Sequence, residues 1–101
     1  MFDKLLQVQQ KAEEIKKKLE TVIVTGESEG GKIKVSANGN KVITSIEIDE
    51  TFISAADKEE LEELLIVATN KALEQAERVH QSEMQSMSQD MLGGLGALFN
   101  K

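Results

Sequence analysis

The stretch Thr25–Ile33, TGESEGGKI, comes close to a phosphate-binding loop. It contains G-x-x-x-x-G-K from Gly26 to Lys32, but Ile33 stands where a Ser or Thr hydroxyl would bind magnesium. A phosphate loop also leads from a strand into a helix, whereas the residues after this loop alternate as in a strand. Two glutamates inside the stretch would repel phosphate. We therefore interpret it as the connection of a β-hairpin and predict no nucleotide site.

The other groups that could do chemistry do not converge. Asp49 and Glu50 follow an alternating run and suit the turn after a strand better than a catalytic pair. The four glutamates within residues 59–63 would spread around two helical turns, which is typical of a solvated acidic face and not of a metal site. His80 is the only histidine, is expected to face solvent, and has no cysteine to accompany it. We predict no catalytic residue, no metal site and no cofactor, and hence no enzyme.

The composition indicates one small soluble domain. The chain has 101 residues, with no Cys, Pro, Trp or Tyr and three Phe, which excludes a disulfide framework and a large aromatic core. The N-terminus lacks the apolar segment of a signal peptide, and no apolar run approaches the roughly 18 residues of a membrane span. We expect a cytoplasmic protein without a membrane or a small-molecule substrate as partner.

The charge is distributed unevenly along the chain. The net charge is −6, but residues 1–48 contain eight lysines and seven acids, whereas residues 49–101 contain four bases and eleven acids. Salt screens exposed charges beyond about 8–10 Å. A partner would therefore respond to local charge, and the N-terminal half is the less acidic one.

Residues 2–20 are predicted to form a helix with a narrow apolar seam. Apolar residues recur in steps of three and four, at Leu5, Val8, Ala12, Ile15 and Leu19. This spacing is typical of a helix that lies against another helix. Lysines follow one flank of the seam, at Lys4, Lys11 and Lys18, with Lys16 and Lys17 nearby. On composition alone, the favoured interpretation of these lysines is a solvated face whose stems cover apolar surface.

Residues 21–49 are predicted to form a three-stranded antiparallel sheet. β-Branched residues fill 21–25, and apolar residues alternate with polar ones on both sides of Asn38-Gly39. This dipeptide predicts a type I′ turn, in which both central residues have positive φ. The turn would pair Ala37 with Asn40, Val35 with Val42, and Ile33 with Thr44. The apolar side chains would then share one face, and the other face would be mildly basic through Lys32, Lys34 and Lys41.

Residues 57–90 are predicted to form a long helix. Asp57 followed by Glu60 is typical of a helix start. One apolar line runs along the helix through Leu61, Leu65, Ala68, Ala72, Ala76 and Val79. Residues 58–85 alone would span roughly 42 Å, more than a sheet of three short strands can cover. We expect a homodimer to bury the surplus apolar surface. Glycines near the C-terminus are expected to end the helix and leave 91–101 as a flexible Gly/Leu tail.

The run from Val24 to Ala72 resembles the YbaB/EbfC family of bacterial nucleoid-associated proteins. The matching residues are Val24-Thr25-Gly26, Gly31, Val35, Asn38-Gly39, Ile46-Glu47-Ile48-Asp49, Asp57, Leu61-Glu62-Glu63-Leu64, Ala68, Asn70 and Ala72. The tail from Leu92 to Leu98 is similar to that family's C-terminus. Glu50 departs from a common Pro and Glu63 from a frequent Asp, and the first helix is richer in Lys and Glu than in Met. These departures leave the fold untouched.

The resemblance implies an α+β fold with one domain over 1–101, in which helical arms project from the shared β core of a homodimer. It also implies binding of double-stranded DNA at the nucleoid and a role in chromosome organisation or gene regulation. Because DNA affinity comes largely from phosphate neutralisation, the candidate DNA-binding residues are Lys4, Lys11, Lys16, Lys17, Lys18, Lys32, Lys34 and Lys41. Arg78 is the only arginine, so little direct base readout is expected. The alternative is a dimeric protein-interaction module that uses the arms and the Met-rich tail without DNA.

Overall fold

The computed structural model describes the backbone of residues 2–99 and the side chains of residues 5–90. Its elements are α1 (Phe2–Glu20), β1 (Ile23–Ser28), the 3-10 turn η1 (Glu29–Gly31), β2 (Ile33–Asn38), β3 (Ile43–Ile48), α2 (Glu50–Ala55) and α3 (Lys58–Phe99). The predicted α+β fold is confirmed, with an N-terminal helix, a three-stranded antiparallel sheet and a long C-terminal helix. The short helix α2 was not predicted. No helix in the described part of the chain combines the length and the apolar character needed to span a bilayer.

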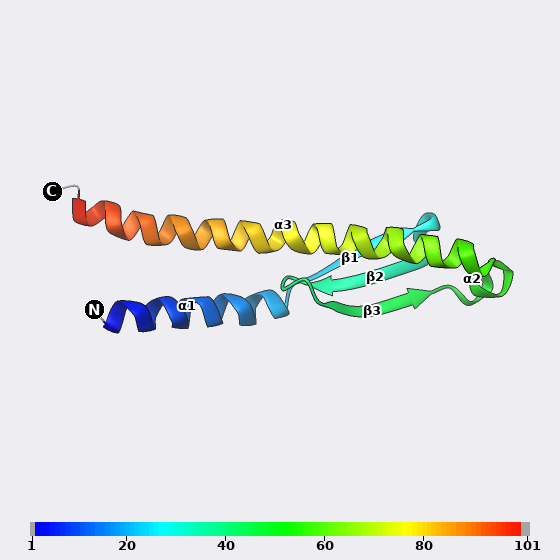
Figure 1. Cartoon of the computed structure of the whole chain (residues 1–101), viewed down its shortest axis with the longest axis horizontal. Helices are drawn as coiled ribbons and strands as arrows, with labels where there is room; N and C mark the ends of the chain where they lie inside the picture. The colour runs from blue at the N-terminus through cyan, green and yellow to red at the C-terminus, as the bar shows by residue number, and fades with distance from the viewer. Residues whose placement is uncertain (1, 100–101) are drawn as a thin grey trace.

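The long helix α3 organises the molecule in two stretches. Its first part lies along the sheet, whose strand order is β1-β2-β3, and its second part runs antiparallel to α1, so that both chain ends lie at one end of the molecule (Figure 1). The principal extents are 68 × 22 × 17 Å and the radius of gyration is 19.4 Å. A compact chain of this length would have a radius of gyration of about 13 Å. We call α1 and the part of α3 after Ala76 the arm.

The core lies between α3 and one face of the sheet, where the central strand β2 supplies the buried residues. Ile33, Val35 and Ala37 of β2 are buried against the alanines of α3 at Ala68, Ala72 and Ala76. Alternation along the strand and a step of four along the helix place these two sets on facing surfaces. The apolar line predicted for the long helix is therefore confirmed over its alanines, where the helix comes nearest to the sheet.

The stretch that resembled a phosphate loop is the β1–β2 hairpin, as predicted. β1 and β2 pair antiparallel, and the connecting turn contains Gly30 and Gly31 at φ 63° and 88°, where side chains are disfavoured. Gly26 lies within β1 and has a different role. A Cβ there would overlap the carbonyl oxygen of Ala68 and the amide nitrogen of Ala72. The first glycine of the motif therefore lets α3 approach the strand closely.

The predicted register of the β2–β3 hairpin is wrong. Val35 pairs with Ile46 instead of Val42, and an irregularity between Ser36 and Ala37 precedes the turn. Neither Asn38 nor Gly39 has a positive φ, so they do not form a type I′ turn. The side-chain Oδ1 of Asn38 instead accepts hydrogen bonds from the amides of Asn40, at 2.9 Å, and Val42, at 3.3 Å. The observed shift of four residues keeps the alternation, so Val35 and Ile46 still share a face.

The C-terminal end of α3 also differs from the prediction. The helix starts at Lys58, after Asp57 as expected, but it continues past residue 90 to Phe99. Glycine costs only about 1 kcal/mol in a helix interior, and the alanine and leucines around these glycines favour helix. The predicted helix end near residue 90 is therefore wrong. The side chains of 91–99 and residues 100 and 101, on which the prediction of a flexible tail falls, lie outside the described part of the chain.

Candidate nucleic-acid interface

The position of α1 is fixed at its C-terminal end by the β2–β3 turn. Leu19 is fully buried, and its carbonyl oxygen accepts a hydrogen bond of 2.8 Å from the amide of Gly39. The side-chain amide of Asn40 donates to the carbonyl of Lys16 at 2.9 Å. A Cβ on Gly39 would lie 2.8 Å from the Leu19 side chain. Gly39 and Asn40 therefore attach the arm to the sheet.

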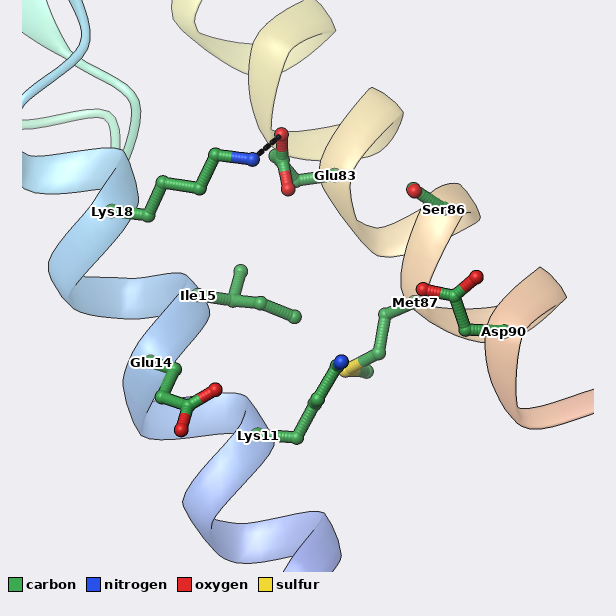
Figure 2. Close-up of a pocket in the computed structure, with 8 residues that line it drawn as sticks. All are labelled: Lys11, Glu14, Ile15, Lys18, Glu83, Ser86, Met87 and Asp90. Carbon is green, nitrogen blue, oxygen red and sulfur yellow. Dashed lines mark ion pairs between the residues drawn. The ribbon is translucent and has the colours of Figure 1, made fainter. Parts of the chain in front are cut away.

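The two helices of the arm meet around a small polar cavity. Ile15 and Leu19 of the predicted seam are buried, whereas Leu5 and Val8 nearer the N-terminus are exposed. The cavity has a volume of about 220 Å³ and is lined by Lys11, Glu14, Ile15, Lys18, Glu83, Ser86, Met87 and Asp90. Figure 2 shows Lys11 and Lys18 extending from α1 toward α3. The seam predicted from the sequence thus packs only over its C-terminal half among the described residues.

Lys18 is engaged by an acid of α3. Its Nζ lies 3.0 Å from Oε1 of Glu83, the ion pair drawn in Figure 2. The side chain of Glu83 is 26% exposed and that of Lys18 is 62% exposed, so the carboxylate is the more enclosed partner. Lys11 lies one heptad earlier on α1, and Asp90 lies one heptad later on α3. Both line the same cavity, without a carboxylate within 4.0 Å of Lys11 among the described residues.

Lys16 and Lys17 occupy a different side of α1. Both side chains are exposed, and neither has an ion-pair partner among the described residues. At 100° per residue, Lys17 points away from the buried Ile15 and Leu19. Lys4 belongs to α1, but its side chain lies outside the described part of the chain. The basic residues of α1 therefore divide into an inner pair, Lys11 and Lys18, and an outer pair, Lys16 and Lys17.

The lysines predicted to share one face of the sheet are not grouped together. Lys32 and Lys34 flank Ile33 at the start of β2, whereas Lys41 lies in the turn after the other end of that strand, with φ 65°. The longer turn explains the difference, because it removes Lys41 from β3. Lys34 also lies between two acids of the neighbouring strands, opposite Glu27 and Glu47. The mildly basic face predicted for the sheet is therefore wrong.

Each of these three lysines has a local partner. Lys32 Nζ lies 5.6 Å from the centroid of the Phe52 ring, within the range of a cation–π contact. Lys34 Nζ lies 4.0 Å from Oε1 of Glu27. Lys41 Nζ lies 3.0 Å from Oε2 of Glu77 on α3. The hydrogen bond and the positive charge of Lys41, in that order, lower the pKa of Glu77 below its ordinary value of 4.5.

The residues first considered for catalysis or metal binding stay apart. Asp49 precedes α2, and the glutamates at 59, 60, 62 and 63 are exposed along the first turns of α3. His80, expected to face solvent, is half-buried, and its Nδ1 is enclosed without a hydrogen-bond partner among the described residues. Within those residues, no three potential ligands among His, Cys, Asp and Glu come together to hold a metal ion.

The acids opposite the lysines were missed by the sequence reasoning. Glu77 and Glu83 were not considered as partners of lysines, yet each contacts a lysine at 3.0 Å. One signal was available, since the heptad from Lys11 to Lys18 has a counterpart in the heptad from Glu83 to Asp90. In an antiparallel pair of helices, a step of seven residues back along α1 corresponds to a step of seven residues forward along α3. Which lysine meets which acid depends on how the sheet, which lies between the two helices in the sequence, positions α1 against α3.

Comparisons with known proteins agree with the resemblance. The model of the YbaB/EbfC DNA-binding family matches residues 1–91. A nucleoid-associated protein of Flavobacterium johnsoniae is 37% identical over 102 residues, covering 98% of this chain and 94% of the relative. A nucleoid-associated protein of Caldanaerobacter subterraneus is 44% identical over 81 residues, covering 77% and 73%. The crystal structure of an uncharacterized protein from Helicobacter pylori superposes with a TM-score of 0.68 at 25% identity, covering 82% and 96%.

Proposed function

Because the chain belongs to the YbaB/EbfC DNA-binding family, we propose that two copies form a nucleoid-associated dimer that binds double-stranded DNA. The dimer contributes to chromosome organisation or gene regulation and carries out no chemical step. Binding is directed to the DNA backbone and shape, since Arg78 is the only arginine available for bidentate base contacts.

The observation that carries this proposal is the set of lysines on the arm without acidic partners. Lys11, Lys16 and Lys17 are exposed and lie on an element that projects from the sheet, with no carboxylate within 4.0 Å among the described residues. Phosphates need such local positive charge, because the net charge of −6 repels DNA at longer range. We assign the main phosphate contacts to these three residues. Lys4, Lys32 and Lys34 remain weaker candidates.

Two features support a second copy beside β3. On the β1 edge, the side chains of Lys71 and Gln75 donate hydrogen bonds of 3.1 and 2.8 Å to the carbonyls of Glu27 and Thr25. No comparable cover lies on the β3 edge among the described residues. An edge with unpaired backbone groups is a ready surface for another chain.

The second feature is apolar surface on the same side. Ile43 and Ile46 of β3 are 37% and 53% exposed, and Ile66 of α3 is 60% exposed. Since Lys71 and Gln75 point toward β1, the helical spacing places Ile66 and Leu73 on the opposite flank of α3, toward β3. Exposed apolar surface between a helix and an open strand is typical of an interface. We therefore propose that the second copy packs here, which leaves the arms free.

The proposal is tested by duplex binding across a salt series. Each neutralised phosphate contributes about −0.9 to the slope of log K against log salt, so K16Q/K17Q is expected to reduce the slope by about 1.8 for each engaged protomer. At 0.15 M salt this corresponds to roughly thirty-fold weaker binding. The matched control is K58Q/K71Q, which removes the same charge outside the arm. Its slope is expected to stay near that of the wild type.

Two results would count against this function. Binding of duplex DNA that is absent or independent of salt would favour the protein-interaction module. An equal loss in both double variants would show that net charge, and not the arm, governs binding. Sedimentation at micromolar concentration tests the dimer separately. I46E is expected to shift it toward monomer, whereas S45E, on the opposite face of the same strand, is not.

A further inference from the structure

Lys18 and Lys41 form ion pairs with carboxylates of α3, and a carboxylate is similar to a phosphate in charge and in its hydrogen-bond acceptors. Glu83 contacts Lys18 and Glu77 contacts Lys41, both at 3.0 Å. Each carboxylate offers the anionic oxygens that a DNA phosphate would offer to the same ammonium group. The two acids lie six residues apart on α3, at the base of the arm. A phosphate that binds Lys18 or Lys41 must therefore share the ammonium group with a carboxylate that is already in place, or displace it.

From this arrangement we infer that Glu83 and Glu77 limit the affinity of the protein for DNA by occupying Lys18 and Lys41. This inference rests on the proposed function and names the residues that set its strength. DNA must compete with Glu83 for Lys18, whereas it meets no such competitor at Lys16 and Lys17 among the described residues. Glu83 thus divides the lysines of α1 into immediately available contacts and a reserved one, Lys18.

The geometry makes the competition reversible. Lys18 is 62% exposed and Lys41 is 44% exposed, so both ammonium groups can be reached from solvent while they are paired. Ion pairs at this exposure add little to stability. A phosphate on DNA can therefore displace the carboxylate without a large conformational cost. The lowered pKa of Glu77, caused by its hydrogen bond with Lys41, shows that this pairing favours the charged acid.

The test is a double-mutant cycle on duplex binding. E83Q removes the competing charge and is expected to add one phosphate contact through Lys18. The added contact steepens the salt slope by about 0.9 for each protomer and tightens binding about five-fold at 0.15 M salt. In the K18Q background the same E83Q change is expected to give no such gain, because the released lysine is absent.

A matched control separates release from general charge. E63Q removes one acid from an exposed position of α3 outside the arm that has no ion pair among the described residues. E83Q is expected to tighten binding more than E63Q does. An equal gain for both variants, or a gain from E83Q that persists with K18Q, would overturn the inference.

A second cycle keeps the test independent of the folding of one variant. E77Q and K41Q remove the partners of the other ion pair and are expected to behave in the same way. Failure of this inference is distinguishable from failure of the proposed function. In the first case the wild type binds DNA with a negative salt slope but neither cycle shows coupling, whereas in the second the wild type does not bind.

Discussion

Gly26 offers a sharp test of the packing that supports the arm. It lies in β1 beneath α3, where a Cβ would overlap the Ala68 carbonyl oxygen and the Ala72 amide nitrogen and lie 2.9 Å from the Cβ of Lys71. Real Cβ atoms essentially never come within 3.0 Å of such atoms. Two of the three obstacles are helix backbone, which cannot turn aside like a flexible side chain. In Gly26→Ala, α3 must therefore move away from the strand.

The cost follows from what that movement opens. Ala68, Ala72 and Ala76 are fully buried against the sheet, so a retreat of the helix separates a whole row of contacts. A gap of about 0.5–1 Å already forfeits a quarter to a half of each dispersion contact. Overpacked cores lose about 1–3 kcal/mol, and a clash with backbone belongs at the upper end. We expect Gly26→Ala to reduce the free energy of unfolding by about 3 kcal/mol.

Urea unfolding measures this change. With a slope of about 2 kcal/mol per molar urea, the midpoint is expected to fall by roughly 1.5 M. All variants are compared at one protein concentration, since association would shift the midpoint. Gly30→Ala is the matched control, because φ at Gly30 is 63° but nothing lies within 4 Å of its Cβ position. That variant tests backbone strain alone, at about 1–2 kcal/mol. A midpoint for Gly26→Ala no lower than that of Gly30→Ala would refute the reasoning.

Two further predictions concern the attachment of α1 and the ion pair of the turn. Gly39→Ala places a Cβ 2.8 Å from the Leu19 side chain and 2.9 Å from its carbonyl, and is expected to accelerate amide hydrogen exchange in α1 more than in β2. The pairing of Glu77 with Lys41 lowers the pKa of the acid, so its stabilising effect is present above pH 4.5 and is lost as the pH falls through the lowered pKa. The difference in urea midpoint between wild type and Lys41→Gln should therefore shrink below pH 4.5; a constant difference down to strongly acidic pH would contradict this.

The faces of the elements were predictable because they depend on local periodicity. Alternation placed Ile33 and Val35 on the buried face of β2, and a step of four placed Ala68 and Ala72 on the buried side of α3. The β2–β3 register was not predictable in this way. Glycine is required at position 39 because a side chain there would collide with Leu19, twenty positions earlier, and not because φ at Gly39 is positive. Turn propensities describe neighbouring residues only, so they do not predict a contact this distant in the sequence.

The division of the lysines could not be read from the sequence either. The seam predicted which side of α1 faces another helix, and burial of Ile15 and Leu19 agrees with it. Which lysine meets an acid depends on how far α1 slides along α3. That offset is set by the β2–β3 turn, which holds the end of α1 through Gly39 and Asn40. Sequence reasoning therefore identified the basic residues but not the ones already engaged.

The helix α3 packs against the sheet and also carries the acids that we infer compete with DNA for lysines. The stability of the arm and the affinity for DNA are therefore linked. Glu83 helps to hold the two helices of the arm through Lys18, at a contribution of about 0–1 kcal/mol for so exposed a pair. The same contact withholds Lys18 from phosphate. Removing the acid is therefore expected to act in opposite directions, loosening the arm slightly while strengthening the grip on a duplex. Under this inference, Glu83 lowers the affinity for DNA while it adds slightly to the stability of the arm.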